Sequence, residues 1–200
     1  MIRYLALGDS YTIGEAVAET ERWPVRLAAL LGERGIELEP PVIIAKTGWT
    51  TDELAAGIEA EAPEGPFDLV TLLIGVNNQY RGLEAADYGV ELCVLLSRAV
   101  ELAGGQADRV LLVSIPDWGA TPFAEGRDRE EIGKAIDRFN EVAVDEASRA
   151  GVRFLDITPG SRRAAEDATL VAPDGLHPSG AMYEEWARAA ADEAAAALAR

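Results

Sequence analysis

Short apolar runs and longer amphipathic stretches alternate along the chain. The runs are rich in Val, Ile and Leu, and their apolar residues follow one another without polar residues between them. This pattern is typical of strands that are buried on both faces of a parallel sheet. The predicted strands are residues 2–7, 41–45, 68–74, 109–115 and 152–157.

Apolar residues between these runs recur at helical spacing. Leu27 and Leu31 share one face of a helix, and Pro24 suits the first turn of that helix. Gly151 and Ser179 stand where the third predicted helix ends and the fourth begins, so we expect them to act as caps. The predicted helices are residues 23–31, 88–100, 128–150 and 179–199.

The repeated change from strand to helix predicts an α/β fold. Five such units predict a three-layer α/β/α sandwich with a five-stranded parallel sheet, which is flavodoxin-like in architecture. The chain has no internal repeat and no low-complexity linker, and segments 61–68 and 103–108 are typical of turns between elements. We therefore expect residues 1–200 to form a single domain.

Polar and glycine-rich segments follow the predicted strands. In open α/β sheets, ligands bind outside the carboxyl ends of the strands, so functional residues are expected in these segments. The segments are GDSYTIGE (8–15), KTGWTT (46–51), GVNNQY (75–80), PDWGATPF (116–123) and, after a longer excursion, PDGLHPSG (173–180).

The last of these segments contains His177, the only histidine of the chain. A serine hydroxyl becomes a good nucleophile when an imidazole takes its proton, and a carboxylate on the other ring nitrogen orients that imidazole. Asp174 and His177 lie three residues apart around Gly175, so they can meet within one turn. The two residues are therefore candidates for the acid and the base of a hydrolase triad. The nucleophile elbow G-x-S-x-G is absent from the chain, which disfavours an α/β-hydrolase.

The sequence resembles the SGNH hydrolases, also called GDSL esterases/lipases. Four sequence blocks mark that family, and they occur here in the family's order along nearly the whole chain. They are GDS at 8–10, the glycine at 48, GVNN at 75–78 and DGLH at 174–177. The chain departs from the family at Asn78, where an aspartate is usual, and it lacks the asparagine often found upstream of Gly48.

The resemblance implies an SGNH hydrolase fold and a role for each matched residue. Ser10 would be the nucleophile, and Asp174 and His177 would complete the catalytic triad. The backbone N–H groups of Ser10 and Gly48 and the side-chain amide of Asn77 would form the oxyanion hole. A glycine suits such a site because the backbone can approach a substrate closely where no Cβ intervenes.

The expected substrate is a small-molecule ester. The family includes carboxylesterases, thioesterases, lysophospholipases and carbohydrate acetylesterases, and the block motifs do not distinguish them. Trp118 and Phe123 are candidates for an apolar wall, and Asp9 and Asn78 are further candidates for contact with substrate. Because the sequence contains no lid-like insertion, we expect a small pocket for a short acyl chain.

Charge and hydropathy argue against nucleic acid and membranes as partners. The chain has 18 Lys and Arg against 35 Asp and Glu, a net charge of −17, which repels nucleic acid and anionic membranes. No apolar stretch approaches the length of a membrane span. The first apolar run is too short for a signal peptide, so we expect a cytoplasmic protein. The sequence does not predict an oligomeric state.

Cofactors and metals are not expected. One histidine and one cysteine cannot supply an ordinary zinc site, although a site made of carboxylates alone is left open. Cys93 has Leu96 and Val100 at helical spacing, so we expect it to be buried.

Three other interpretations compete with the esterase. A flavodoxin-like flavin-binding protein would use the segment 8–15 to hold the flavin phosphate, but it would leave Asp174 and His177 unexplained. A receiver domain would need an aspartate after the third strand and a lysine after the fifth, and the chain has Asn77 and no lysine there. The third is a binding-only relative with the same fold, which the intact triad residues disfavour.

Overall fold

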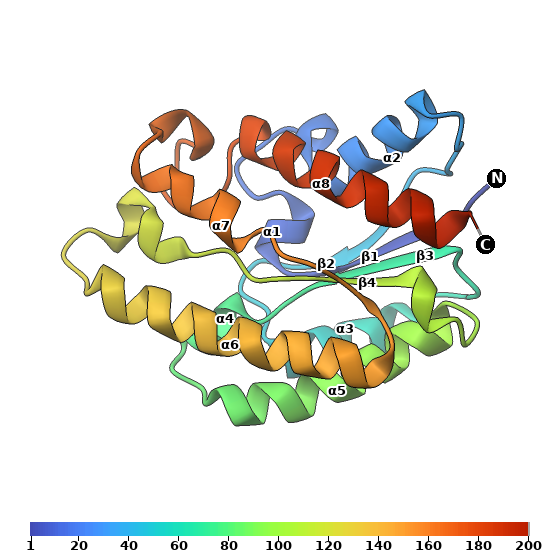
Figure 1. Cartoon of the computed structure of the whole chain (residues 1–200), viewed down its shortest axis with the longest axis horizontal. Helices are drawn as coiled ribbons and strands as arrows, with labels where there is room; N and C mark the ends of the chain where they lie inside the picture. The colour runs from blue at the N-terminus through green and yellow to red at the C-terminus, as the bar shows by residue number, and fades with distance from the viewer. Residues whose placement is uncertain (200) are drawn as a thin grey trace.

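A computed structural model describes residues 1–199, and these residues contain a five-stranded parallel sheet (Figure 1). The strands lie within one or two residues of the predicted ranges. They are β1 (Tyr4–Gly8), β2 (Val42–Ala45), β3 (Leu69–Leu73), β4 (Val110–Val113) and β5 (Arg153–Leu155). Their order is β2-β1-β3-β4-β5, and every neighbouring pair is parallel, with Leu5 opposite both Val42 and Val70. The predicted fold class is confirmed.

Helices cover both faces of this sheet (Figure 1). The longer helices are α2 (Trp23–Glu33), α3 (Thr51–Glu61), α5 (Ala85–Leu102), α6 (Arg129–Ala150) and α8 (Gly180–Leu198). Helices α2 and α8 pack against each other on one face, and α3, α5 and α6 lie on the other. Shorter helices are α1 (Ser10–Ile13), α4 (Val76–Tyr80) and α7 (Thr158–Ser161). Short 3-10 turns occur at Glu19–Glu21, Ala107–Arg109, Trp118–Ala120, Pro122–Ala124, Arg162–Ala165 and Ala168–Leu170.

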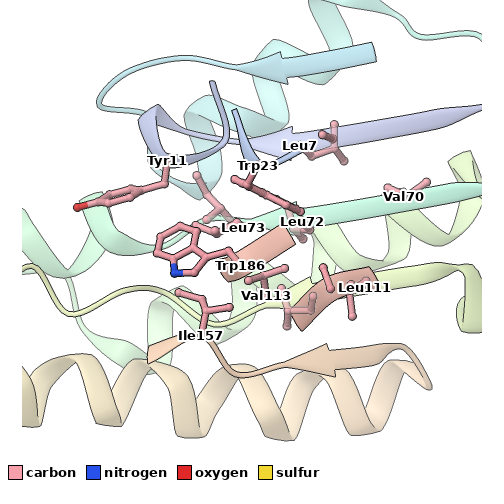
Figure 2. Close-up of a cluster of buried hydrophobic side chains, with 14 of the residues drawn as sticks. Leu7, Tyr11, Trp23, Val70, Leu72, Leu73, Leu111, Val113, Ile157 and Trp186 are labelled. Carbon is pink, nitrogen blue, oxygen red and sulfur yellow. The ribbon is translucent and has the colours of Figure 1, made fainter. Parts of the chain in front are cut away.

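The core lies between the sheet and these helices. Every residue of β1, β3 and β4 is buried, whereas the edge strands β2 and β5 are partly exposed. Figure 2 shows Trp186 of α8 reaching over the sheet toward Tyr11 of α1, and their ring centroids are 6.4 Å apart. Each fully buried Leu or Val contributes about 1.5–3 kcal/mol relative to exposure, so this central packing fixes the position of α1 beside β1.

The predicted helix caps are confirmed. Pro24 lies in the first turn of α2, where its missing N–H costs no intrahelical bond. Gly151 ends α6 in the left-handed conformation with φ of 68°. The Ser179 side chain accepts a hydrogen bond from the backbone N–H of Met182 in the first turn of α8.

The prediction that Cys93 is buried was wrong, because its side chain is exposed. The buried stripe of α5 contains Leu92, Leu95, Leu96 and Ala99. Cys93 follows Leu92 by one residue, a rotation of about 100° around the helix axis, and this turns it away from the sheet.

Four helices near the carboxyl ends of the strands were not predicted: α1, α3, α4 and the four-residue α7. Helices α1 and α4 fall in segments that we expected to be loops, and each is only one or two turns long. Thr50 caps the start of helix α3, and its backbone N–H donates to the Glu53 carboxylate at 2.9 Å. Only Leu54 and Ile58 give it an apolar stripe among its Ala, Gly and Glu residues, so its periodicity is weak.

No helix within residues 1–199 combines the length and the apolar character needed to cross a membrane.

Candidate active site

The predicted site residues meet where the connections of the sheet change direction. After β1 the chain continues to β2 on one side, and after β3 it continues to β4 on the other side. Such a switch point leaves a crevice at the carboxyl ends of the two strands. Ser10 begins α1 directly after β1, and Asn77 lies in α4 directly after β3. Asp174 and His177 come from the loop before α8.

Ser10, His177 and Asp174 form a continuous hydrogen-bonded row. The Ser10 Oγ atom lies 2.9 Å from Nε2 of His177, and Nδ1 of His177 lies 2.6 Å from Oδ2 of Asp174. Ser10 and His177 are 4% and 7% exposed, so bulk water is largely excluded from the bond between them. In this geometry the imidazole can take the proton of the serine hydroxyl while the carboxylate holds its other nitrogen.

Backbone hydrogen bonds keep Asp174 ionised. Burial acts to raise its pKa, but hydrogen bonds from the His177 ring and from the backbone N–H groups of Leu176 and His177 outweigh burial. The two N–H groups donate to Oδ1 at 2.9 and 3.0 Å. The pKa of Asp174 is therefore below its ordinary value, which suits a permanent negative charge beside the imidazole.

The loop that carries His177 is a tight turn. Gly175 has φ of 74°, a conformation that residues with a Cβ rarely adopt, and this lets Asp174 and His177 face each other. The His177 carbonyl accepts from the Ala172 N–H at 2.8 Å, and the Gly175 carbonyl accepts from the Phe123 N–H at 2.9 Å. These bonds fix the imidazole relative to the segment 116–123.

The turn from β1 into α1 leaves no space for a larger residue at position 8. A Cβ added to Gly8 would overlap Oγ1 of Thr12 and the carbonyl oxygen of Leu73. Asp9 then caps α1, because its Oδ1 accepts the Tyr11 N–H at 3.0 Å. The turn places Ser10 in the first position of the helix, with its hydroxyl toward His177.

The backbone N–H groups of Ser10 and Gly48 have no acceptor within residues 1–199. Both residues line one cavity. Gly48 has φ of 87°, and the nearest atom to an added Cβ would be Nη2 of Arg81 at 4.0 Å. The same Nη2 donates to the Gly48 carbonyl at 2.6 Å and so holds this turn in place. The two N–H groups can donate to a negatively charged oxygen.

Asn77 lines the same cavity, but its amide nitrogen already has partners. Nδ2 donates to the Trp49 carbonyl at 2.9 Å and to Oδ2 of Asp9 at the longer distance of 3.3 Å. The amide therefore lies between the segment after β2 and the turn after β1.

Asp9 and Asn78 do not lie on the cavity wall, contrary to the expected contact with substrate. Both side chains are fully buried. Asn78 accepts the Thr51 N–H at 3.1 Å and donates to the Thr51 hydroxyl at 2.6 Å, so it joins α4 to the start of α3. Asp9 points toward Asn77 beneath the cavity, and burial raises its pKa to about 7. A sequence pattern does not reveal such inward orientation, because it depends on contacts between distant segments.

The cavity has a volume of about 150 Å³. Its lining residues are Ser10, Tyr11, Thr47, Gly48, Val76, Asn77, Tyr80, Trp118, Phe123, Leu176 and His177. Trp118 and Phe123 lie on the wall, as the sequence predicted. Tyr80 and Tyr11 were not predicted, although each belongs to a segment that follows a strand.

Three rings form an aromatic wall, which we define as Tyr80, Trp118 and Phe123. Their centroids are 5.3 to 6.1 Å apart, and the Arg127 guanidinium lies 5.2 to 5.3 Å from all three rings. The Trp118 indole N–H donates to the Gln79 side chain at 2.7 Å. Contacts of this kind contribute about 0.5–1 kcal/mol each at exposed positions, so together they orient the wall.

The part of the chain that the structure describes contains no group of three or more His, Cys, Asp and Glu side chains arranged to hold a metal ion.

Comparison with models of protein families shows to which family the chain belongs. The model of the GDSL-like lipase/acylhydrolase family matches residues 6–185. The chain belongs to this family. It is therefore an ester-hydrolysing enzyme of the GDSL type, which favours the hydrolase over the flavin-binding and receiver interpretations.

Solved structures of other proteins share the fold of this GDSL hydrolase. TesA is 20% identical with a TM-score of 0.76, and the match covers 98% of this chain and 99% of TesA. The acetylxylan esterase Axe2 from Geobacillus stearothermophilus is 20% identical with a TM-score of 0.75, over 96% and 94% of the two chains. The esterase EstA from Pseudoalteromonas sp., in a structure inhibited by monoethylphosphonate, is 15% identical with a TM-score of 0.70, over 100% and 97%. No curated protein matches the chain in sequence.

Proposed function

We propose that this GDSL hydrolase is a serine esterase that cleaves carboxylic esters with short acyl chains through an acyl-enzyme on Ser10. One observation carries the proposal. The Ser10 hydroxyl, both nitrogens of the His177 ring and the Asp174 carboxylate form one hydrogen-bonded row that ends in a cavity, with distances of 2.9 and 2.6 Å.

Acylation begins when Ser10 Oγ attacks the ester carbonyl carbon and His177 Nε2 takes the hydroxyl proton. Asp174 stabilises the resulting imidazolium through Nδ1. The bond between the carbonyl carbon and the alcohol oxygen then breaks, and His177 gives the proton to the departing alcohol. A water molecule, deprotonated by the same imidazole, attacks the acyl group and regenerates the Ser10 hydroxyl.

The oxyanion of each tetrahedral intermediate needs hydrogen-bond donors. The N–H groups of Ser10 and Gly48 face no competing protein acceptor, and Asn77 Nδ2 is the side-chain donor on the cavity wall. Loss of one such donor typically lowers turnover by about 10²–10³-fold.

The size of the cavity favours a short acyl chain. Its volume of about 150 Å³ is smaller than the 300–1,000 Å³ that is usual for drug-sized ligands. The aromatic wall closes one side of the cavity, and residues 116–123 that carry most of it are tied to the His177 loop.

An acetyl ester of a carbohydrate is a second candidate substrate. Tyr80 and Phe123 are 44% and 39% exposed at the cavity, so their rings offer a surface on which a sugar can stack. The fold similarity to an acetylxylan esterase agrees with this candidate. Thioesters and lysophospholipids are further alternatives on the same triad.

The test is hydrolysis of p-nitrophenyl esters of increasing acyl length by the wild type, Ser10→Ala and Ser97→Ala. Ser97 is an exposed serine of α5 that bonds only to a backbone carbonyl, so it controls for loss of a hydroxyl. We expect activity in the wild type and Ser97→Ala, with an optimum at short chains, and a loss of about 10³-fold or more in Ser10→Ala. Equal turnover by Ser10→Ala would contradict the proposal. An acetylated xylo-oligosaccharide in the same assay tests the second candidate.

A further inference from the structure

Asp9 occupies an unusual place for a carboxyl group, directly before Ser10 and completely buried. Oδ1 accepts the Tyr11 N–H at 3.0 Å, and Oδ2 accepts an Asn77 amide hydrogen at 3.3 Å. Asp9 forms no ion pair with any side chain of residues 1–199. Its two partners are uncharged, so nothing in direct contact offsets the cost of burying a negative charge.

The titratable groups around Asp9 come from four parts of the chain. They are Tyr11 of α1, Tyr88 of α5, Tyr183 of α8, and Asp174 and His177 of the loop before α8. Within this set, only His177 can carry a positive charge, and it does so only when protonated. No group in this set therefore offers Asp9 a permanent positive charge.

The Asn77 amide has a fixed direction. Its two nearest partners, the Trp49 carbonyl and the Asp9 carboxylate, are both acceptors, so the nitrogen and not the oxygen must face them. An amide nitrogen has two hydrogens, and both are used. The bond to Trp49 is short and the bond to Asp9 is long, so the hydrogen directed at Asp9 is the one that an oxyanion can take.

We propose that Asp9 is a positioning residue whose ionisation controls whether Asn77 donates to the oxyanion. An ionised Asp9 retains the Asn77 hydrogen and so keeps it from the oxyanion. A neutral Asp9 holds that hydrogen weakly and releases it as the oxyanion forms. The inference rests on the proposed function, because it assigns Asp9 a role in the reaction at Ser10.

The consequence is a rate that falls at alkaline pH. Burial raises the pKa of Asp9 to about 7, so Asp9 is neutral below this pH and ionised above it. Ionisation of Asp9 therefore decreases kcat as the pH rises through this range. Because Asn77 acts on the transition state, the decrease belongs to kcat and not to KM.

The experiment measures kcat and KM for p-nitrophenyl acetate from pH 5 to 9 in the wild type, Asp9→Asn, Asn77→Ala and Asp192→Asn. Asp192 is an exposed carboxylate on α8 that pairs with Arg34. Asp192→Asn therefore makes the same change in charge as Asp9→Asn, but at a position outside the site. We expect kcat of the wild type and Asp192→Asn to fall by up to about tenfold per pH unit above pH 7–8. We expect no such fall in Asp9→Asn, which cannot ionise.

Asn77→Ala shows whether Asp9 acts through Asn77. Its kcat should be lower by about 10²–10³-fold and should not fall at alkaline pH, because the donor that Asp9 controls is missing. This variant keeps Asp9 and decides the question even where Asp9→Asn fails to fold, which circular dichroism would show.

An alkaline fall that persists in Asp9→Asn or in Asn77→Ala would overturn the inference, as would a wild type without any fall. Absence of Ser10-dependent hydrolysis would overturn the proposed function and the inference together. Ser10-dependent hydrolysis with the same alkaline profile in all variants would overturn the inference alone.

Discussion

The Asp174 carboxylate differs from the other two members of the proposed triad in how it contributes. In the proposed mechanism Ser10 forms the covalent bond and His177 moves the proton, whereas Asp174 only orients and stabilises the imidazole. Its side chain is 34% exposed, so water can replace part of its interaction with Nδ1 of His177. The three residues are therefore expected to act as a unit but not equally.

Replacement of Asp174 by alanine should lower kcat less than replacement of Ser10. We expect Asp174→Ala to retain roughly 10²-fold more activity than Ser10→Ala, because the hydroxyl and the imidazole remain in place. Steady-state kinetics on p-nitrophenyl acetate measure the difference. If Asp174→Ala were as inactive as Ser10→Ala while remaining folded, the carboxylate would have a larger role than orientation.

The residues of the proposed triad were easier to predict than the buried residues beneath the cavity. Ser10, Asp174 and His177 belong to sequence blocks with a fixed spacing, and His177 is the only histidine. Asp9 and Asn78 belong to the same blocks, yet both side chains are buried and bond to segments distant in the sequence. Their roles follow from packing between the connections of β1, β2 and β3, which local sequence does not encode.

At the scale of elements, we expect the aromatic wall to set the length of acyl chain that fits the cavity. Phe123 lies on the wall, and only part of its side chain is buried, so its removal opens the cavity without emptying the core. We expect Phe123→Ala to shift the preferred acyl chain toward longer esters and to change kcat for the acetate little. The acyl-length series measures this shift, with Val90→Ala on the exposed face of α5 as the control.

An unchanged chain-length optimum in Phe123→Ala would show that the acyl group lies elsewhere in the cavity. In that case Phe123 would border the alcohol part of the substrate, and the carbohydrate candidate would be favoured.

Elements with a wide apolar stripe were predicted well, and short ones were not. Helices α2, α5, α6 and α8 each bury several large or closely spaced apolar residues at helical spacing. Helices α1 and α4 are too short to show a period, and their place depends on the tight turns after β1 and β3. The elements that position the site are therefore the ones that periodicity detects least.

At the scale of the whole molecule, the site and the stability of the fold are coupled through Asp9. Burial raises the pKa of Asp9 to about 7 in the folded protein, against about 3.9 in an unfolded chain. Between these values the folded state holds a proton that the unfolded state has lost. The free energy of unfolding therefore decreases as the pH rises through this window.

Asp9→Asn should remove the loss of stability that the ionisation of Asp9 causes as the pH rises. We expect its free energy of unfolding to exceed that of the wild type by more at pH 8 than at pH 4, with a difference on the order of a few kcal/mol. Denaturant unfolding of the wild type and of Asp9→Asn at pH 4 and pH 8 gives the four free energies of unfolding that this comparison needs. A difference between the proteins that is the same at both pH values would show that Asp9 has an ordinary pKa.

The layers of the molecule could be predicted from sequence, and the observed strand order is that of the predicted flavodoxin-like architecture. Alternation of strands and helices requires a parallel sheet with helices on both faces. The order β2-β1-β3-β4-β5 creates the switch point at which Ser10 and Asn77 meet, and it depends on which strands pair. Trp118 and Phe123 could be predicted as a wall of the cavity, whereas the contribution of Tyr80 became visible only in the structure.

Covalent labelling tests the central claim most directly. Diethyl p-nitrophenyl phosphate reacts with an activated serine: the Oγ–P bond forms and p-nitrophenolate leaves. The account predicts one released p-nitrophenolate and one adduct per chain, located on Ser10 by peptide mass spectrometry, and a much slower reaction in His177→Ala. The remaining serines, at positions 97, 114, 148, 161 and 179, should stay unmodified. No adduct on the folded wild type, or an adduct on another serine, would contradict the account.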